Sequence, residues 1–412
     1  MKIGFFTDAY FPQVNGVTTS VYETAKELRK NGHEVFIIAP KYPNYKDEDK
    51  DVIRLSSMPL IKKINVRLGT HLPEKSLFKL YRKKFDIIHG HNGGTMSLLG
   101  LEVAVLQKIP FVFTYHTLLN KYAHYLWEGL VLRPKMIEIG SKIFCNQCNA
   151  VIAPAQKIKD ILLSYGVKKP IFILPTGLDI KKFEGVDDGY LRKRLHLKKS
   201  DKILLYVGRL GQEKSVDFIV KAFKRVLKKN KNVVLVLVGD GHERGTLESL
   251  ALDLGIKEKI FFTGNIISKD MPRVYKDSDI FVFASQTETQ GLCVLEAAAS
   301  GIPAVVIKDA AFENLAIDGK TGFSVPANLE VFAEKVAELL KDDNLRQLFG
   351  KNAKEMVKNN FGSDYLTREL LQTYKKILVN YKPGGEVLRK INSATLVPLF
   401  RATMAINKYL NS

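Results

Sequence analysis

The chain has 412 residues, more than one hydrophobic core usually supports, so two domains are expected. No apolar run approaches the roughly 18 residues of a spanning helix, and Met1 leads directly into an apolar strand without a signal-peptide layout. Three cysteines indicate a reducing, cytosolic compartment, and the net charge of +20 indicates either a partner with negative charge or a role in solubility.

The first half of the chain alternates strand and helix patterns. Mostly apolar strands are predicted at residues 2–6, 34–39, 87–90, 111–115 and 151–153, with a helix at 17–29 that ends at Asn31-Gly32. Strands that alternate with helices are typical of a parallel sheet. A doubly wound α/β domain is therefore expected.

The residues from 54 to 84 form a basic amphipathic segment. It contains nine lysines and arginines against one acid, Glu74, and apolar residues are interleaved with them. Such a segment lies on an anionic membrane more naturally than in a nucleic-acid groove, although a helix packed on its own domain is the alternative. The residues expected to dock on the membrane are Lys62, Lys63, Arg67, Lys75, Lys79, Arg82, Lys83 and Lys84.

Two positions in the first half follow strands at the sheet edge where α/β domains bind ligands. Gly16 ends the loop 7–17 at a helix start, where a glycine lets the backbone approach an anion, although helix entry alone would also explain it. His116 ends the strand 111–115. Lone histidines are often structural, but this placement favours a role in a ligand site.

Cys145 and Cys148 have the spacing of a redox or half-zinc motif. No second pair exists, and Cys293 is distant in sequence. Reduced structural thiols are therefore expected.

The strand and helix pattern begins again after a polar connector at 181–201. Strands are predicted at 203–208, 233–239, 260–263, 279–284 and 304–307, and helices at 215–228, 243–254, 329–340 and 363–376. The expected domains are residues 1–178 and 179–362, each a doubly wound parallel sheet. Helices in the C-terminal region 363–412 are expected to return to the first domain, and its basic, apolar tail at 387–410 is a second candidate surface helix.

Two cations follow the first strand of the second domain. A guanidinium fork at Arg209 and an ammonium at Lys214 suit a diphosphate, although solvated surface charge is the alternative. Asp277 and Asp279 have the D-x-D spacing of metal-binding sugar transferases, but they precede a strand, so a strand-entry turn is expected. Gly239-Asp240-Gly241 lacks the full dinucleotide fingerprint, which argues against a dehydrogenase.

The most informative feature is a pair of glutamates, Glu288 and Glu296, separated by seven residues. Glu288 follows the strand 279–284, and Glu296 lies about one turn inside the next helix. Such a helix start presents free N–H groups to a phosphate. Each carboxylate can accept bonds from two hydroxyls, which fits a ribose and a sugar on either side of a diphosphate. Surface glutamates that offset a helix dipole are the alternative.

These residues resemble the family 4 glycosyltransferases, which are retaining enzymes with the two-domain GT-B fold. The resemblance covers nearly the whole chain. It rests on residues 11–17, 175–179, 208–214 and 239–241, and above all on the Glu288-x7-Glu296 motif.

Within that family the chain is similar to the bacterial diacylglycerol glucosyltransferases. The similarity lies in Thr114-Tyr-His-Thr117, Tyr122, His124-Tyr125 and Glu288-Thr-Gln-Gly-Leu292. Leu118-Leu119-Asn120 departs from that subgroup, which usually carries a tyrosine and an acidic residue there, and the departure leaves the acceptor open.

The resemblance implies catalytic roles for four side chains. Arg209 and Lys214 would hold the nucleotide diphosphate and offset the charge of the leaving group, so no metal or other cofactor would be needed. Glu288 would bind the hydroxyls of the donor sugar. His116 would contact that sugar near its anomeric carbon.

The resemblance also implies the rest of the donor site. Glu296 would bind the ribose, and Gly16 would face the diphosphate from the first domain. The backbone around Gln290, Gly291 and Leu292 would contact the phosphate and the sugar.

The implied reaction is transfer of glucose from UDP-glucose to the 3-hydroxyl of 1,2-diacylglycerol with retention of configuration. It would occur at the inner face of the cell membrane, through a same-face mechanism that requires closure of the two domains. Another donor such as GDP-mannose or UDP-galactose, and another acceptor such as phosphatidylinositol or a cell-wall precursor, remain open. A noncatalytic sugar-nucleotide-binding scaffold and a nucleic-acid-binding protein are the alternatives from other classes, and the second lacks a recognised binding module.

Overall fold

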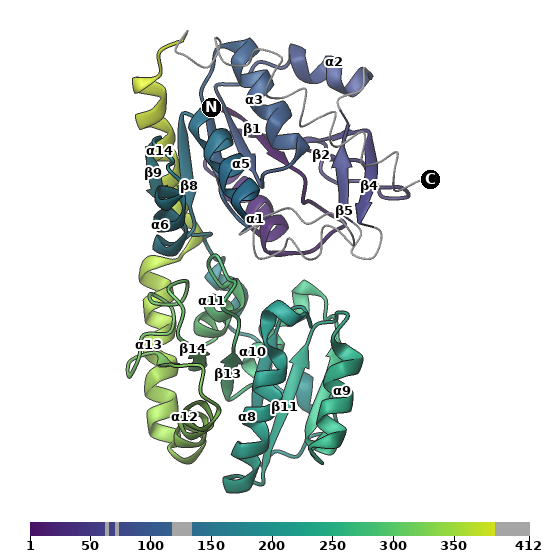
Figure 1. The fold of residues 1–412 in the computed structure, drawn as a ribbon, viewed down its shortest axis with the longest axis vertical. Helices are drawn as coiled ribbons and strands as arrows, with labels where there is room; N and C mark the ends of the chain where they lie inside the picture. The colour runs from purple at the N-terminus through teal and green to yellow at the C-terminus, as the bar shows by residue number, and fades with distance from the viewer. Residues whose placement is uncertain (62–65, 71–73, 118–133, 384–412) are drawn as a thin grey trace.

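Two parallel sheets, stacked along the long axis of the molecule, organise the chain (Figure 1). The computed structural model describes residues 1–61, 66–70, 74–117 and 134–383. No helix in these ranges is long and apolar enough to cross a bilayer. The predicted fold class, two doubly wound α/β domains, is confirmed.

The first sheet contains seven strands in the order β3-β2-β1-β6-β7-β8-β9, all parallel. Its five inner strands are mostly buried because helices cover both faces, whereas the edge strands β3 and β9 are partly exposed. The strand bounds are β1 Lys2–Thr7, β2 Glu34–Pro40, β3 Val52–Leu55, β6 Ile87–His91, β7 Phe111–Thr114, β8 Ala150–Ala153 and β9 Ile171–Ile173.

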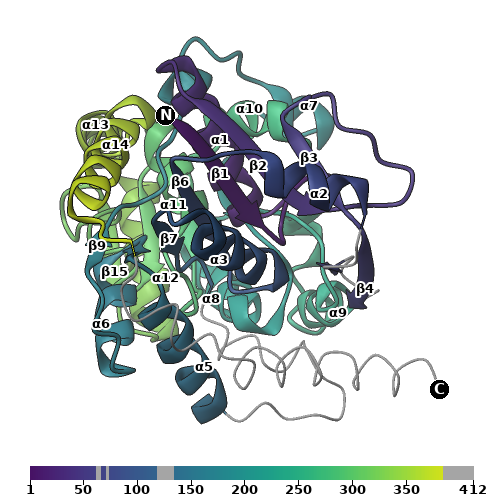
Figure 2. The same cartoon turned by 90° about the horizontal axis from the view of Figure 1, so that it is seen from above.

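Helices pack on both faces of this sheet. One face carries α1 (Gly16–Lys30) and α14 (Ser363–Asn380). The other carries α2 (Lys75–Arg82), α3 (Thr95–Gln107), α5 (Pro134–Gln147) and α6 (Gln156–Ser164). Viewed along the long axis, α14 and α13 (Asp343–Asn360) lie together at one edge of the molecule, opposite α2 (Figure 2).

The second sheet contains six parallel strands in the order β12-β11-β10-β13-β14-β15. The strand bounds are β10 Lys202–Val207, β11 Val233–Val238, β12 Ile260–Gly264, β13 Ile280–Phe283, β14 Ala304–Ile307 and β15 Gly322–Val325. The helices are α8 Val216–Lys229, α9 Arg244–Asp253, α10 Met271–Lys276, α11 Leu292–Ala299, α12 Leu329–Lys341 and α13. The predicted elements of this half agree with these to within two residues at most ends, whereas α10, α13 and β15 were not predicted.

The connector 181–201 is partly helical. It includes the 3-10 turn η3 (Ile180–Phe183) and the short helix α7 (Tyr190–Arg194). Phe183 and Leu191 from these turns are buried in the core of the second domain, which explains why the polar segment is ordered.

The chain passes between the domains twice, at adjacent points. The Leu178 N–H donates to the Phe361 carbonyl oxygen at 2.8 Å, and the Ser363 N–H donates to the Leu178 carbonyl oxygen at 3.0 Å. A methyl group at Gly177 would lie 2.7 Å from the Ser363 Cα, so the close approach requires glycine. From there α14 runs along the first domain and buries Leu370 and Tyr374 in its core (Figure 1).

The basic segment 54–84 is not one continuous amphipathic element. Its first residues end β3, and β4 (Ser57–Ile61) and β5 (Val66–Gly69) form an antiparallel hairpin. Among its described residues, those of α2 alone form an amphipathic helix. A mixture of basic and apolar residues fits a half-buried hairpin as well as a helix, which is why composition did not separate the two.

Candidate functional site

The site predicted from the sequence lies where the two sheets face each other. β7 and the loop before α1 approach it from the first domain, and the loop from β13 to α11 approaches it from the second. Contacts across the domains bring Gly16 next to Leu292 and His116 next to Thr289.

Lys214 and Glu288 form an ion pair. Lys214 ends the 3-10 turn η4 (Gln212–Lys214), and its Nζ donates to Glu288 Oε1; the two side chains are only 11% and 17% exposed. Burial raises the pKa of the Glu288 carboxyl, but Lys214 and Ser285 outweigh it, so the pKa lies below its ordinary value. The resemblance assigns these side chains to different parts of the donor, and the structure joins them to each other.

Two glycines hold the loop that carries Arg209. A methyl group at Gly239 would lie 2.0 Å from the Gly208 carbonyl oxygen, and one at Gly241 would lie 2.3 Å from that of Leu210. The Tyr206 hydroxyl donates to the Arg209 carbonyl oxygen at 2.9 Å. The Gly-Asp-Gly motif is therefore a packing motif that fixes the backbone of Arg209 at the carboxyl end of β10.

Glu296 lies inside α11 and accepts a hydrogen bond from the Tyr275 hydroxyl of α10 at 2.7 Å. Burial raises the pKa of the Glu296 carboxyl, and the Tyr275 hydrogen bond and the Lys182 charge offset only part of that effect. Sequence reasoning missed Tyr275, because nothing in the sequence relates α10 to α11.

Two helix N-termini face each other across the domains. A methyl group at Gly16, the first residue of α1, would lie 3.5 Å from Cδ1 of Leu292, the first residue of α11. Gly291 caps α11 at φ +76°, where a Cβ would also lie 2.4 Å from the Phe312 ring, so both the backbone and the packing require glycine. Such an arrangement of N–H groups and helix dipoles suits a phosphate.

His116 is held from both domains. Its Nε2 lies 3.1 Å from Nδ1 of His91, and its carbonyl oxygen accepts a hydrogen bond from the Thr289 hydroxyl at 2.9 Å. Burial lowers the pKa of His116 to about 4, so its ring is neutral at pH 7. Sequence reasoning missed His91, although the strand ending His89-Gly-His91 repeats the signal that selected His116.

Gln290 joins the domains through its side chain. Its amide oxygen accepts from the Thr176 N–H at 2.8 Å, and its Nε2 donates to the Thr176 carbonyl oxygen at 3.0 Å. The Thr176 hydroxyl in turn donates to Ser20 of α1 at 2.9 Å. The resemblance implies a backbone role for this position, and the side chain adds a contact that sequence reasoning did not anticipate.

A second buried ion pair, unlike that of Lys214 and Glu288, joins one domain to the other. Lys157 of α6 lies 2.6 Å from Asp309 Oδ2, and it also donates to the Gln286 carbonyl oxygen at 3.2 Å. No sequence pattern predicted this pair, because its members lie outside the recognised motifs.

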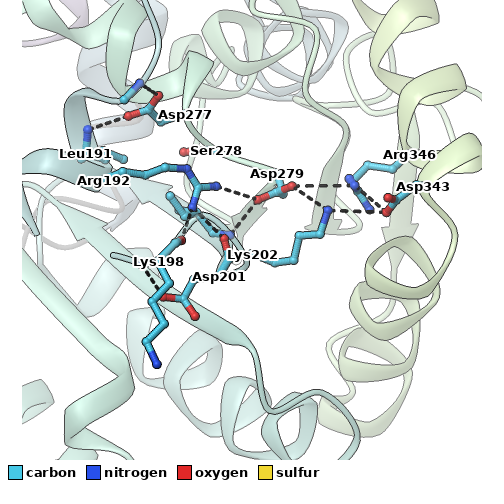
Figure 3. Close-up of polar contacts among 12 residues, drawn as sticks. Leu191, Arg192, Lys198, Asp201, Lys202, Asp277, Ser278, Asp279, Asp343 and Arg346 are labelled. Carbon is cyan, nitrogen blue, oxygen red and sulfur yellow. Dashed lines mark hydrogen bonds and ion pairs between the residues drawn. The ribbon is translucent and has the colours of Figure 1, made fainter. Parts of the chain in front are cut away.

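Asp277 and Asp279 serve the turn before β13, as predicted. Asp277 accepts hydrogen bonds from the N–H groups of Gly189 and Leu191, and Asp279 accepts from the Ile203 N–H at 2.9 Å. Figure 3 shows Asp279 surrounded by cations, which are Arg192, Lys202 and Arg346. These carboxylates link α7, β10 and α13 to β13.

Cys145 and Cys148 are free and buried, as predicted for structural thiols. Burial raises the pKa of Cys145 to about 12, so its reactive thiolate form is disfavoured at neutral pH.

The predicted docking residues occupy three different situations. Lys62 and Lys63 lie outside the described residues. The Arg67 Nε–H donates to the Ser57 hydroxyl at 2.8 Å, and the Lys83 Nζ lies 3.4 Å from the centroid of the Phe36 ring. The remaining cations are exposed on or beside α2: Lys75, Lys79, Arg82 and Lys84.

Helix α2 has one face in the core and one in solvent. Leu77 and Leu80 are buried, whereas Phe78 is 60% exposed. Lys75, Phe78, Lys79 and Arg82 follow the i, i+3, i+4, i+7 spacing of one helical face. An exposed aromatic ring between three cations is the composition of an interfacial helix.

Two family models match the chain, one for each sheet. "Glycosyltransferase Family 4" matches residues 14–182, and "Glycosyl transferases group 1" matches residues 188–356.

Two relatives carry the same name. The alpha-monoglucosyldiacylglycerol synthase of Streptococcus pneumoniae is 36% identical over 328 residues, which are 78% of this chain and 74% of the relative. The enzyme of that name from Acholeplasma laidlawii is 32% identical over 355 residues, 83% of this chain and 87% of the relative.

Solved structures share the two-domain arrangement. Anabaena HepE in complex with UDP gives a TM-score of 0.74 at 18% identity, over 91% of this chain and 100% of HepE. Sucrose-phosphate synthase from Thermosynechococcus elongatus gives 0.75 at 22% identity, over 92% of this chain and 99% of that protein. At these identities the likeness shows the fold.

Proposed function

Because this chain belongs to the family 4 glycosyltransferases and has their GT-B fold, we propose that it transfers glucose from UDP-glucose to the 3-hydroxyl of 1,2-diacylglycerol. The observation that carries the proposal is the meeting of Glu288, Lys214 and the α11 N-terminus with Gly16 and His116 between the domains. The names of the two synthase relatives support the choice of sugar and lipid.

The donor would bind mainly to the second domain. Arg209 and the facing N-termini of α1 and α11 would hold the diphosphate, and Glu296 the ribose. Lys214 would turn from Glu288 toward the phosphates, and Glu288 would then accept hydrogen bonds from the sugar hydroxyls. Cations and N–H groups that stabilise the departing UDP supply the electrostatic part of catalysis without a metal ion.

The acceptor hydroxyl would attack from the face that the diphosphate leaves. The C–O bond to the acceptor forms while the bond to the phosphate oxygen breaks, and that oxygen takes the acceptor proton, so configuration is retained. Neutral His116 would contact the sugar beside the reacting carbon. Closure of the two domains would exclude water from the reacting groups.

The lipid acceptor would be reached at the inner face of the cell membrane. The exposed face of α2, with Phe78 among Lys75, Lys79 and Arg82, would lie on anionic lipid. Docking there would let a diacylglycerol enter without leaving the bilayer.

The test is transfer of label from UDP-glucose, UDP-galactose and GDP-mannose to diacylglycerol or phosphatidylinositol in vesicles that contain anionic lipid. We expect α-glucosyldiacylglycerol, identified by NMR of the product, formed equally with and without a chelator. Glu288→Ala should lose nearly all activity, and Glu258→Ala, at an exposed position of the same domain, should retain it. A different preferred donor or acceptor would redirect the proposal, and no turnover of any donor would favour a noncatalytic scaffold.

A further inference from the structure

Three histidines form a stack between the sheet of the first domain and the candidate site. His89 and His91 are two residues apart in β6, so their side chains lie on the same side of the strand. Their ring centroids are 4.0 Å apart. The His116 ring follows at 5.3 Å from that of His91, inclined by only 22°. The Phe5 ring also contacts His91, at 4.6 Å between centroids. The His91 ring is therefore fixed on several sides.

His89 links the stack to α14 and to β7. His89 Nδ1 lies 2.5 Å from the Tyr374 hydroxyl of α14, and His89 Nε2 lies 2.6 Å from the Thr114 hydroxyl of β7. Both ring nitrogens of His89 therefore have partners. His91 differs, because one of its nitrogens meets His116 and the other meets no hydrogen-bonding group among the described residues.

Each ring of the stack is neutral at pH 7. Burial lowers the pKa of His89 and of His91 well below the ordinary value, and it lowers the pKa of His116 to about 4. A neutral imidazole carries one N–H and one lone pair. The contact between His91 Nδ1 and His116 Nε2 therefore contains one proton, and the ring that donates it determines the protonation of both.

The buried Nε2 of His91 decides between the two arrangements. If His116 donated from Nε2, His91 would carry its proton on its own Nε2, a buried N–H with no acceptor in the described part of the chain. If His91 donates from Nδ1, the atom without a partner is only a lone pair. Buried N–H groups without an acceptor are rarer in proteins than buried acceptors without a donor. The second arrangement is therefore favoured, and it places the proton of His116 on Nδ1.

We propose that His91 is a positioning residue that holds His116 as the Nδ1–H tautomer, so that His116 donates a hydrogen bond to an acceptor oxygen of the bound sugar. This inference rests on the proposed function for the identity of the ligand. It assigns His116 the role of a hydrogen-bond donor and excludes it as the base that deprotonates the lipid hydroxyl. His91 acts only through His116.

The tautomer can be measured without activity. Two-bond ¹H–¹⁵N correlation spectra of histidine-labelled protein distinguish protonated from bare ring nitrogens, and His91→Phe and His116→Asn identify the signals. We expect a protonated Nδ1 and a bare Nε2 on His116, and a protonated Nδ1 on His91, with and without UDP. A protonated Nε2 on His116 would overturn the proposal, even if the protein transfers glucose.

Kinetics test whether the contact matters. In His91→Phe an aromatic ring remains but the donor is lost, and kcat should fall on the order of 10- to 100-fold, the loss seen when groups that orient the imidazole ligands of metal sites are removed. The KM for UDP-glucose should change little. His91→Asn keeps an N–H donor near the position of Nδ1 and should recover much of that loss. Wild-type kcat in His91→Phe, or equal losses in both variants, would contradict a positioning role.

Tyr374→Phe provides the matched control. It removes one buried hydrogen bond from the same stack but leaves the contact between His91 and His116 in place. It should keep the His116 tautomer and most of kcat. If it changed the His116 tautomer, the assignment to His91 would be wrong. A wild-type protein that uses no UDP-glucose would refute the proposed function, while the tautomer would still be decided by the spectra.

Discussion

The hydroxyl of Thr289 in the second domain donates a 2.9 Å hydrogen bond to the carbonyl oxygen of His116 in the first. Thr289 lies between the two glutamates that the sequence singled out, in the same loop as Gln290, which bonds to Thr176 across the domains. The loop that would hold the donor is therefore also the loop that touches the other domain. In the proposed reaction, binding of the donor and closure of the domains would act on the same few residues.

Removal of the Thr289 hydroxyl should slow the reaction. Thr289→Val keeps the shape but loses a hydrogen bond of about 0.5–1.5 kcal/mol, which corresponds to a loss of about two- to tenfold in kcat. Steady-state kinetics with UDP-glucose would measure it. Thr289→Ser keeps the hydroxyl and serves as the control, and equal rates in the Val and Ser variants would show that the contact is irrelevant to turnover.

Loss of the Lys214 charge should destabilise the protein. Lys214→Met leaves the buried Glu288 carboxylate without its partner, and breaking a buried pair costs about 3–5 kcal/mol, less here because both groups retain some exposure. Urea unfolding would measure the change, with Lys214→Arg as the control that keeps the charge. A Met variant as stable as wild type would mean that the pair contributes nothing to folding.

The Lys214–Glu288 pair should also make the stability of the protein depend on pH in acid. The pKa of Glu288 is depressed in the folded state, so its contribution to stability is present above the pKa of the unfolded carboxyl, near 4.5, and is lost as the pH falls through the folded value. Below about pH 4.5 the free energy of unfolding should therefore fall more steeply in wild type than in Glu288→Gln. Parallel pH profiles would contradict this account.

Burial of His116 should make the free energy of unfolding depend on pH in a higher range than Glu288 does. The pKa of His116 falls from 6.5 to about 4 on folding, so between these values the unfolded state binds more protons and stability declines as the pH is lowered. Above pH 6.5 His116 is neutral in both states, so it no longer lowers the free energy of unfolding. His116 alone accounts for up to about 3 kcal/mol across this range.

His116→Asn should flatten that decline, and the exposed His196→Asn should leave it unchanged. Unfolding midpoints in urea at half-unit steps from pH 7 to pH 4 would compare the three proteins. An unaltered slope in His116→Asn would show that its ring is protonated as easily in the folded state as in the unfolded one.

Vesicle binding should depend on the exposed face of α2. Replacing Lys75, Lys79 and Arg82 by glutamine removes about 1 kcal/mol of attraction per residue, which corresponds to roughly 100-fold weaker binding to anionic vesicles. Binding of wild type should also weaken as salt is raised. Co-sedimentation would measure both effects, with Lys351→Gln on α13 as the control. Strong wild-type binding to neutral vesicles at high salt would contradict electrostatic docking.

Much of the fold was predictable because its strands are buried on both faces. Segments such as 34–39 and 304–307 are short apolar runs between turn signals, and parallel strands with helices on both sides require such runs. The site residues were predictable for a related reason, since the ends of these runs meet at one sheet edge. Helix α13 was not predicted, although its apolar residues, such as Leu345, Phe349 and Val357, recur at helical spacing.

What the sequence did not reveal lies in contacts between distant segments. The bond from Tyr275 to Glu296 and the contact of His91 with His116 depend on how α10 and β6 are placed, and local patterns carry no information on that placement. The hairpin in the basic segment was missed for a different reason. The mixture of basic and apolar residues in this segment suits a helix and a strand equally.

The adjacent crossing points at Leu178 and Ser363 would restrict the proposed motion of the two domains. Both chain passes are joined there by hydrogen bonds of 2.8 and 3.0 Å, so they form a single narrow connection. A rotation about this connection moves every part of the second domain on an arc, whereas a straight sliding motion would break it. In the domain motion that we propose, a sugar held by Glu288 would therefore travel on an arc relative to His116, and the length of that arc would be set by the distance between the sugar and Leu178.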